Sequence, residues 1–394
     1  MKKFLSFLLS LCLGLFLADA VISFLDDSLI LLLGIHVLAA LRFLVALLAS
    51  LASMQVYLLL GITPMVPKRF FLPVTLFMPL ATLATIPWLI HHHEQFVQIT
   101  WVLSLGQLAL GLLILRWAQG ALRFRWPLIP VEQLGGRKFS WWNLSGFVIG
   151  NLCLLAPAVL FHLMYCASLA TDHFSAGFLA LHPSGLSARA KTFVRSDGKT
   201  IRLIPMMHIG RSGFYNEIEK SFPTNSVVLT EGVTDRQKRL QHKLTYKKAA
   251  SALGLVEQKE VFLPKQARKH WADVDIEQFS KGTIELLDLT AAIHSEGPTL
   301  ANILRLLNKS QDPALADQLM NDILLKRNEH LLAEIGKEMG NSDVIVVPWG
   351  AAHMPGISEE IQKLGFKPVE SQEFTVVDFH RNAHPAVVAQ PPKK

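Results

Sequence analysis

Three polar residues follow short apolar runs of the kind that forms buried β-strands. His208 follows the run IRLIPMM, Glu231 follows VVLT, and His353 follows VIVVPWGAA. If these runs are neighbouring parallel strands, two imidazoles and one carboxylate meet at the sheet edge where the strands end. Two histidines and one carboxylate can bind Zn, Mn, Co or Fe and leave coordination positions open. A metal held in this way activates a bound water and polarises a carbonyl, so the pattern predicts a hydrolytic site.

Alternative interpretations of these residues stay open. Each one alone is also explained as a hydrogen-bonded polar residue at a strand end, a common position for such side chains. Within a metal site, Glu231 would be either a metal ligand or the general base that takes a proton from water. The ligand set indicates a divalent ion such as Mn, Co or Zn without selecting among them.

Further residues are candidates for contacts with a substrate. Arg327, in LLKRNEH, would bind a substrate carboxylate or hold Glu231 in place, and a solvated helix face is the alternative. Asp273 and Asp275, in WADVDIEQF, would line the cleft or cap a helix, and we favour a cap for Asp275. Tyr215 would face the site or pack in the core, and we favour packing.

The elements that must position these residues alternate between strands and helices. A hairpin is predicted over 191–208, and further strands are predicted at 226–232, 343–350 and 373–380. Helical spacing of apolar or charged residues is found at 211–221, 235–253, 274–293, 314–339 and 355–364. Apolar strands that alternate with helices predict an α/β domain with a mostly parallel sheet covered by helices on both faces.

The N-terminal half has a different composition from this domain. The chain has 394 residues, and up to about residue 172 Leu, Ala, Phe and Val dominate. A helix needs about 20 mostly apolar residues to span a bilayer. We therefore predict a membrane region at 1–172 with about five transmembrane helices, the first an uncleaved anchor and the second open to extension by 28–36. The five stretches lie near 4–25, 37–61, 70–90, 98–117 and 144–169.

The connections between the predicted spans alternate in charge. By the positive-inside rule the N-terminus is cytoplasmic, and an odd number of spans places the α/β domain outside the cytoplasm. This is the topology expected of a multi-pass protein of the plasma (bacterial inner) membrane, in contact with lipid. The net charge of +7 then reflects topology and indicates no nucleic-acid partner. The basic connections hold Lys2, Lys3, Lys68, Arg69 and 116–138, and the acidic ones hold Asp26, Asp27 and Glu94.

Charged residues are rare inside the predicted spans. Arg42 lies in an apolar run near the outer end of the second span, where its side chain can extend to the membrane surface. The spans show no internal repeat, no pair of Gly- or Pro-interrupted helices and no rows of acidic residues. This pattern argues against a transporter.

Composition divides the rest of the chain into three parts. A linker is predicted at 173–190, the α/β domain at 191–383 and a flexible tail at 384–394. The three cysteines of the sequence all lie in apolar segments of the first 172 residues. The α/β domain therefore has neither a disulfide framework nor a thiolate zinc site.

The domain resembles the TraB/GumN/TIKI family. The segments that carry the resemblance cover about 190 residues and include HIGRSGFYNEI, VVLTEGV, LGLVEQ, ADVDIEQFS, RNEHLLAEI and WGAAHMPGISEEIQKLGF. Members share a paired G-x-x-H signature and a glutamate. Gly350 to His353 matches the second signature, Glu231 falls at the glutamate, and Arg327 matches the arginine of the family. The first signature keeps His208 but has Pro205 where the family usually has glycine.

The resemblance implies a function for the domain but not for the membrane region, which it does not cover. TIKI members look like extracytoplasmic divalent-metal proteases, and other members are linked to peptide-pheromone shutdown. The sequence thus predicts a membrane-anchored, metal-dependent hydrolase that acts on a peptide or protein. The alternative is a non-catalytic module in which the cleft binds a peptide or other ligand.

Overall fold

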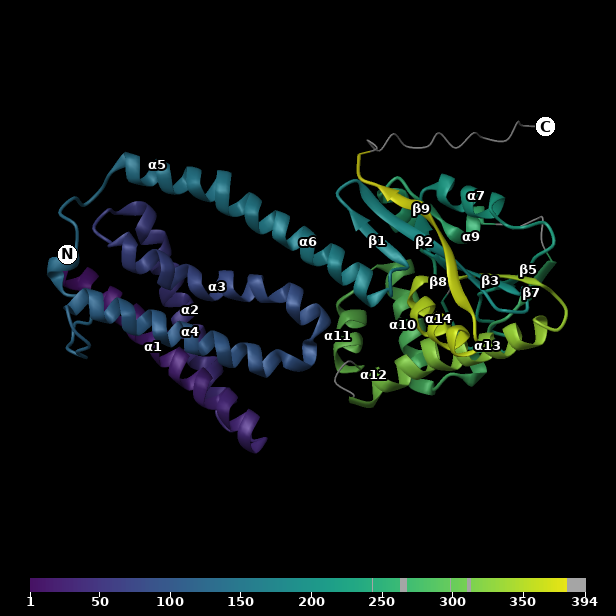
Figure 1. Ribbon diagram of the computed structural model, residues 1–394, viewed down its shortest axis with the longest axis horizontal. Helices are drawn as coiled ribbons and strands as arrows, with labels where there is room; N and C mark the ends of the chain where they lie inside the picture. The colour runs from purple at the N-terminus through teal and green to yellow at the C-terminus, as the bar shows by residue number, and fades with distance from the viewer. Residues whose placement is uncertain (243, 263–267, 298, 310–312, 381–394) are drawn as a thin grey trace. The chain divides into compact units, whose positions relative to one another are not determined.

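The computed structural model describes residues 1–380 except 243, 263–267, 298 and 310–312. The chain separates into two compact units, a helical unit at Met1–Leu169 and a sheet unit at Ala170–Lys394 (Figure 1). The predicted tail at 384–394 lies outside the described residues. The predicted linker at 173–190 is not an extended connection, because most of it forms the first two strands of the sheet unit.

The helical unit contains long helices joined by short connections. Five of the helices among the described residues are long and apolar enough to cross a membrane, the last of them interrupted by the π-helical turn η3. The helices are α1 (Lys2–Leu33), α2 (Ala39–Ile62), α3 (Lys68–His91), α4 (Phe96–Gln119), α5 (Trp141–Gly150), η3 (Asn151–Leu155) and α6 (Ala156–Phe174). Short 3-10 turns lie at η1 (His93–Gln95) and η2 (Val131–Gln133).

The first helix is longer than the sequence predicts. The apolar stretch at 28–36 extends α1 instead of α2, because the chain leaves the helix only at Gly34, in the left-handed conformation with φ 68°. Asp26 and Asp27 therefore lie within α1 and are fully buried, whereas the sequence places them in a connection. The error arose because two adjacent acidic residues in an apolar chain are more typical of a loop.

The surface of the helical unit differs from that of a water-soluble bundle. Large apolar side chains such as Phe4, Phe43, Trp142 and Leu154 are exposed on its surface. Its interior combines an apolar core shared by α1 to α4 with buried polar residues. An apolar exterior is what contact with lipid requires. The buried polar residues are Ser6, Ser10, Asp19, Ser23, Asp26, Asp27, Thr63, Thr75, Ser104, Gln107 and Asn143.

The sheet unit has a seven-stranded mixed sheet with strand order β1-β2-β3-β8-β5-β7, in which β9 pairs with β2. The pairs β3–β8, β8–β5 and β5–β7 are parallel, and the pairs of β2 with β1, β3 and β9 are antiparallel. The strands are β1 (Leu179–His182), β2 (Gly185–Val194), β3 (Thr200–Met206), β5 (Val227–Thr230), β7 (Arg268–Trp271), β8 (Val344–Gly350) and β9 (Lys367–Asp378). A two-stranded sheet joins β4 (Ile209–Gly210) and β6 (Val256–Glu257).

The prediction of a mostly parallel sheet is therefore correct for only one side of this sheet. The half that carries the strand ends of interest is parallel. The other half is antiparallel: β1 and the first part of β2 lie in the predicted linker, and β9 runs antiparallel to the whole of β2. The predicted hairpin at 191–208 is present as β2 and β3, with its turn at Asp197 and Gly198.

Helices cover both faces of the sheet, as predicted. Leu203, Val347 and Trp349 face α13 (Lys326–Glu338) and α14 (Met354–Lys363) in one apolar core. Residues on the alternate face, such as Ile204 and Val346, pack against α7 (Ser212–Lys220) in a second core. The remaining helices are α8 (Lys247–Ala252), α9 (Gln258–Val261), η4 (Ile276–Gln278), α10 (Lys281–Glu296), α11 (Leu300–Lys309), α12 (Pro313–Leu319), η5 (Met320–Leu325) and η6 (Ala351–His353).

The helix predicted at 235–253 is present only as the short α8. Asp235 accepts hydrogen bonds from the backbone N–H groups of Arg239 and Leu240, and Asp288 accepts from those of Gln241 and His242. Side-chain carboxylates thus bind the amides that a helix would have used, and the segment folds as turns.

Candidate functional site

The candidate site lies where three adjacent parallel strands end. Glu231 follows β5, Asp273 follows β7, and the turn Gly350–His353 follows β8. Because β8, β5 and β7 are neighbours and parallel, their carboxyl ends share one edge of the sheet. Arg327 comes from α13, which packs on the same face as Trp349 of β8.

Arg327 is the centre of the cluster, and all five of its N–H groups are used. Nε donates to Asp273 Oδ1 at 3.0 Å, and Nη2 donates to Asp273 Oδ2 at 2.7 Å and to Glu231 Oε1 at 2.6 Å. Nη1 donates to the carbonyl of Ile323 at 3.3 Å and to His353 Nε2 at 3.0 Å. A guanidinium has five donors, so none is left for a substrate in this arrangement. Of the two roles predicted for Arg327, the geometry favours holding Glu231 in place.

The backbone before Arg327 is irregular. The π-helical turn η5 ends directly before α13 begins. The carbonyl of Ile323, within this turn, accepts a hydrogen bond from Arg327. Single π turns inside helices are frequent at functional sites. Burial lowers the pKa of Arg327, but the bonds to Asp273 and the charges of Glu231 and Asp273 outweigh this and raise it. The guanidinium is therefore a permanent buried cation.

Glu231 is held by two strong donors and still has room for more. Oε1 accepts from Arg327, and Oε2 accepts the backbone N–H of Gly350 at 2.6 Å. Each carboxylate oxygen has two acceptor positions, so each keeps one for a water or substrate group. The side chain is 16% exposed, against 8% for Arg327 and 1% for Asp273. Glu231 is thus the member of the ion-paired cluster most open to solvent.

His353 is a buried, neutral imidazole. Its Nε2 lies 3.6 Å from Glu231 Oε1, and its ring meets the Trp349 ring edge-on at 5.2 Å. Burial, together with the charge of Arg327, lowers the pKa of His353 to about 4, although Glu231 and Asp273 act in the opposite direction. With Nε2 accepting from Arg327, the proton belongs on Nδ1, which lies 2.7 Å from Asn328 Oδ1.

Asp273 binds Arg327 from a buried position and does not line an open cleft. Its oxygens also accept the backbone N–H groups of Gly232 and Val274, each at 2.8 Å. Because the side chain of Asp273 is buried, it does not lie where a residue that contacts a substrate was expected. Asp275 caps the turn η4 by accepting from Glu277 N, which is the role that the sequence favoured.

Tyr215 belongs to the other face of the sheet. It is fully buried in the core beneath α7, and its hydroxyl donates to the carbonyl of Met207 at 2.8 Å. Burial, with the nearby charge of Glu257, raises the pKa of the phenol. Trp349 and His353 adjoin the opposite core, so Tyr215 packs and is not placed to bind a substrate at this edge.

His208 reaches the same edge of the sheet but has different partners. It follows β3, whose Met206 pairs with Gly350 of β8. Its exposed ring stacks on Tyr246, with ring centres 5.1 Å apart and planes 7° from parallel. Among the described residues, the ring contacts of His208 are thus separate from the cluster that joins Glu231 to His353.

The described residues do not form a metal site in this arrangement. Within the described part of the chain, no three His, Cys, Asp or Glu side chains lie close enough together to hold one ion. The Nε2 lone pair of His353 faces the cationic guanidinium of Arg327, which would repel a divalent ion. We therefore derive no catalytic step through a metal.

Two residues of the cluster were not predicted from the sequence. Asn328 orients His353, and Trp349 contacts both Arg327 and His353 while its Nε1 donates to the carbonyl of Leu229 at 3.0 Å. Both adjoin predicted positions, in RNEH and in PWG, which is the only local signal for them. Their role depends on the crossing of α13 over β8, which is not visible in sequence.

Chemically, the cluster presents a fixed carboxylate with free acceptor positions beside a neutral imidazole. Two carboxylates, one guanidinium and a neutral histidine leave a net charge of −1 at this edge. Such a group can orient a water molecule and take its proton, or bind a donor group of a ligand. In comparisons with known proteins, no family model, curated protein or solved structure matches the chain.

Proposed function

We propose that the chain is a multi-pass membrane protein whose sheet unit is a hydrolase that lies outside the cytoplasm. The membrane part rests on five long apolar helices and on the apolar exterior of the helical unit. The orientation rests on the charges of the connections other than Asp26 and Asp27, which lie within α1. A reporter active only outside the cytoplasm, fused after residue 394, is expected to work, and one active only inside is expected to be silent. The opposite result contradicts the topology.

The hydrolase part is supported by one observation, the fixed and partly exposed carboxylate of Glu231. Arg327 and the Gly350 amide hold it in a single orientation, so its free acceptor positions point to a defined place. In amide hydrolysis Glu231 would take a proton from water while the water oxygen bonds to the carbonyl carbon. The proton would then pass to the amine nitrogen as the C–N bond breaks. His353 and Arg327 act as positioning residues in this scheme.

The resemblance to the TraB/GumN/TIKI family supports a peptide as the substrate and a divalent metal as the cofactor. The arrangement of Arg327 and His353 does not fit a metal ion, because the Nε2 lone pair of His353 accepts from the guanidinium of Arg327. Assays with Mn, Co or Zn added, and with a chelator, decide it directly. A chelator that leaves peptide cleavage unchanged would separate this chain from the metal-dependent members.

Glu231→Gln tests the hydrolase. The substitution preserves size but removes the negative charge, and loss of a general base typically lowers the rate by about 10²–10⁴-fold. We expect the full-length variant to lose cleavage of a peptide library while it keeps its fold. Glu217→Gln, in a half-exposed ion pair on α7, is the matched control and should retain activity.

A binding module is the second candidate, and it is favoured because all five donors of Arg327 are already bonded. Because every donor of Arg327 is bonded within the cluster, Glu231 is held in one position and can accept a hydrogen bond from a ligand. If wild type cleaves no peptide but binds one, and Glu231→Gln weakens that binding, the module replaces the hydrolase. If cleavage and binding are both insensitive to Glu231→Gln, this edge of the sheet is not the site.

A further inference from the structure

The helical unit contains a second buried polar cluster, which lies outside the region covered by the family resemblance. Asp19, Ser23, Asp26 and Asp27 are spaced i, i+4, i+7 and i+8 and therefore share one face of α1. All four are buried. Arg42 of α2 donates to Asp26 at 3.2 Å and to Asp27 at 2.5 Å. The side chain predicted to extend to the membrane surface is thus held by two carboxylates, and the spans do contain acidic residues.

Asp19 is the member without a charged partner. Gln107 Nε2 donates to Asp19 Oδ2 at 2.9 Å and to the carbonyl of Phe16 at 2.9 Å. The Phe16 carbonyl can only accept, so it defines which end of the Gln107 amide is the nitrogen. Asp19 Oδ1 is buried without a hydrogen-bond partner among the described residues, and Asp19 as a whole is 5% exposed.

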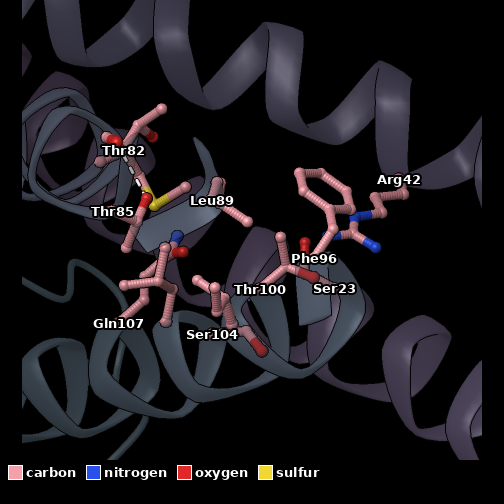
Figure 2. A pocket seen from close by; sticks show the side chains of 12 residues that line it. Ser23, Arg42, Thr82, Thr85, Leu89, Phe96, Thr100, Ser104 and Gln107 are labelled. Atoms are coloured by element: carbon pink, nitrogen blue, oxygen red, sulfur yellow. Dashed lines mark hydrogen bonds between the residues drawn. The ribbon is translucent and has the colours of Figure 1, made fainter. Parts of the chain in front are cut away.

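A cavity of about 160 Å³ reaches Gln107, the hydrogen-bond partner of Asp19, and is lined by both hydroxyl-bearing and apolar side chains (Figure 2). It is bounded by α1 to α4, with Phe96 and Arg42 at one end and Gln107 and Thr82 at the other. Phe96 is the first residue of α4 and Gln107 lies near its middle, about 16 Å further along the axis at 1.5 Å per residue. The polar lining residues are Ser23, Arg42, Thr82, Thr85, Thr100, Ser104 and Gln107.

The charges in this region do not balance. Three carboxylates, Asp19, Asp26 and Asp27, face one guanidinium, which is already paired with the last two. His36, after α1, pairs with Asp26 at 3.3 Å. The facing parts of the other helices supply no compensating group, because 70–90 and 96–115 contain no Asp, Glu, Lys, Arg or His. Arg42 is the charged residue that acts on Asp19 electrostatically. An isolated carboxylate in apolar surroundings is costly, and such residues mark ion or proton sites.

We propose that Asp19 is a proton-binding site in the middle of the helical unit, next to the cavity that ends at its partner Gln107. A proton requires one acceptor position, and Oδ1 provides it. A metal cation requires several oxygen ligands, whereas one side of Asp19 is occupied by the amide donor of Gln107. The cavity is large enough for several waters at about 30 Å³ each, which can carry a proton from the Arg42 end to Gln107, the residue bonded to Asp19. The proposal depends on the membrane location of the helical unit but not on hydrolase activity.

Carbodiimide labelling of the full-length protein in lipid vesicles tests the proposal. A protonated carboxylic acid adds across one C=N bond of dicyclohexylcarbodiimide, and the adduct rearranges to a stable N-acylurea without a leaving group. We expect the reagent to label Asp19, detected by peptide mass, and the labelling to fall at least tenfold as the pH rises from about 5 to about 10. Asp26 and Asp27 are internal controls, because both carboxyl groups are bonded to Arg42, and we expect them to stay unlabelled.

Variants and competing ions make the outcome decisive. Asp19→Asn should remove the label, and Asp19→Glu should retain it, which separates loss of the carboxyl from loss of the fold. Labelling that is absent at every pH, or equal at every pH, overturns the proposal. Protection of Asp19 by sodium or another metal ion at constant pH would also overturn it, in favour of a metal cation. Extraction of the protein from membranes by alkaline carbonate is a separate result that contradicts the membrane location itself.

Discussion

The helical unit and the sheet unit each hold an arginine between two carboxylates, but they satisfy the remaining polar atoms differently. In the sheet unit, Arg327 joins Glu231 to Asp273, and every donor of the guanidinium is used. In the helical unit, Arg42 joins Asp26 to Asp27, while Asp19 on the same helix face keeps one buried oxygen without a partner.

The difference follows from the backbone available around each cluster. At a strand end the chain leaves the sheet, so amide groups are free to donate, and Gly232, Val274 and Gly350 all donate to the carboxylates there. In the middle of a helix every amide is already bonded within the helix, so a carboxylate depends on side chains alone. Gln107 supplies one such donor to Asp19.

This comparison indicates what each cluster is suited to do. A cluster completed by backbone amides has one geometry, which suits a site that must orient a reactant. A cluster that depends on one side-chain donor keeps an open acceptor, which suits the uptake and release of a small ion or proton. Four measurements, from the largest expected effect to the smallest, can contradict or refine this view.

Arg327→Met should have the largest effect. It leaves the buried carboxylate of Asp273 and the partly exposed carboxylate of Glu231 without a cation, and breaking a buried pair costs about 3–5 kcal/mol. Hydrogen exchange of full-length protein should show lost protection in peptides covering 227–231 and 344–353. Arg236→Met, at an exposed arginine, is the control and should leave protection unchanged. Equal protection in Arg327→Met would mean that the cluster is not held by its arginine.

The buried imidazole of His353 should make the stability of the sheet unit depend on pH. Its pKa is about 4 when folded against an ordinary value of 6.5, so below pH 6.5 the unfolded chain takes up a proton that the folded chain does not. The contribution of His353 to stability should therefore be complete above pH 6.5, fall by about 3 kcal/mol as the pH is lowered to 4, and change no further below that. Hydrogen exchange across this range measures it, and His353→Gln should remove the dependence.

Gln107→Leu tests the dependence of the helical cluster on a single donor. Both oxygens of Asp19 would then lack a partner, and an unsatisfied buried polar group costs about 1–3 kcal/mol. Thermal unfolding of the full chain in detergent should show a destabilised helical unit. Gln98→Leu, at an exposed glutamine of the same helix, is the matched control. A neutral result for Gln107→Leu would mean that Asp19 has another source of donors.

Helix ends should behave alike in the two units, because free amides exist at helix ends in both. Ser140 caps α5 by accepting from Asn143 N, and Ser280 caps α10 by accepting from Thr283 N. Ser140→Ala and Ser280→Ala should each cost about 1 kcal/mol, measured as increased exchange in the first turn of the helix. A large difference between them would show that surroundings, and not backbone donors, distinguish the two units.

Some of the fold was predictable because its signals are local. The apolar runs before Glu231 and Gly350 predict β5 and β8. Two strand-like segments on either side of the turn at 196–198 predict the hairpin of β2 and β3. Long apolar stretches predict the helices of the first unit. The positions of Glu231 and His353 at strand ends follow from the same runs. In each case hydrophobic periodicity within a few residues determines the element.

Tertiary structure alone decided the partners of the charged residues. Arg42 meets Asp27 from 15 residues away and Arg327 meets Glu231 from 96 residues away, so neither pairing leaves a pattern in the local sequence. The face on which Tyr215 lies, the separate contacts of His208 and the antiparallel half of the sheet were likewise determined by how the elements pack. A buried charge requires its counter-charge within a few ångströms, and only the folded chain determines which residues come that close.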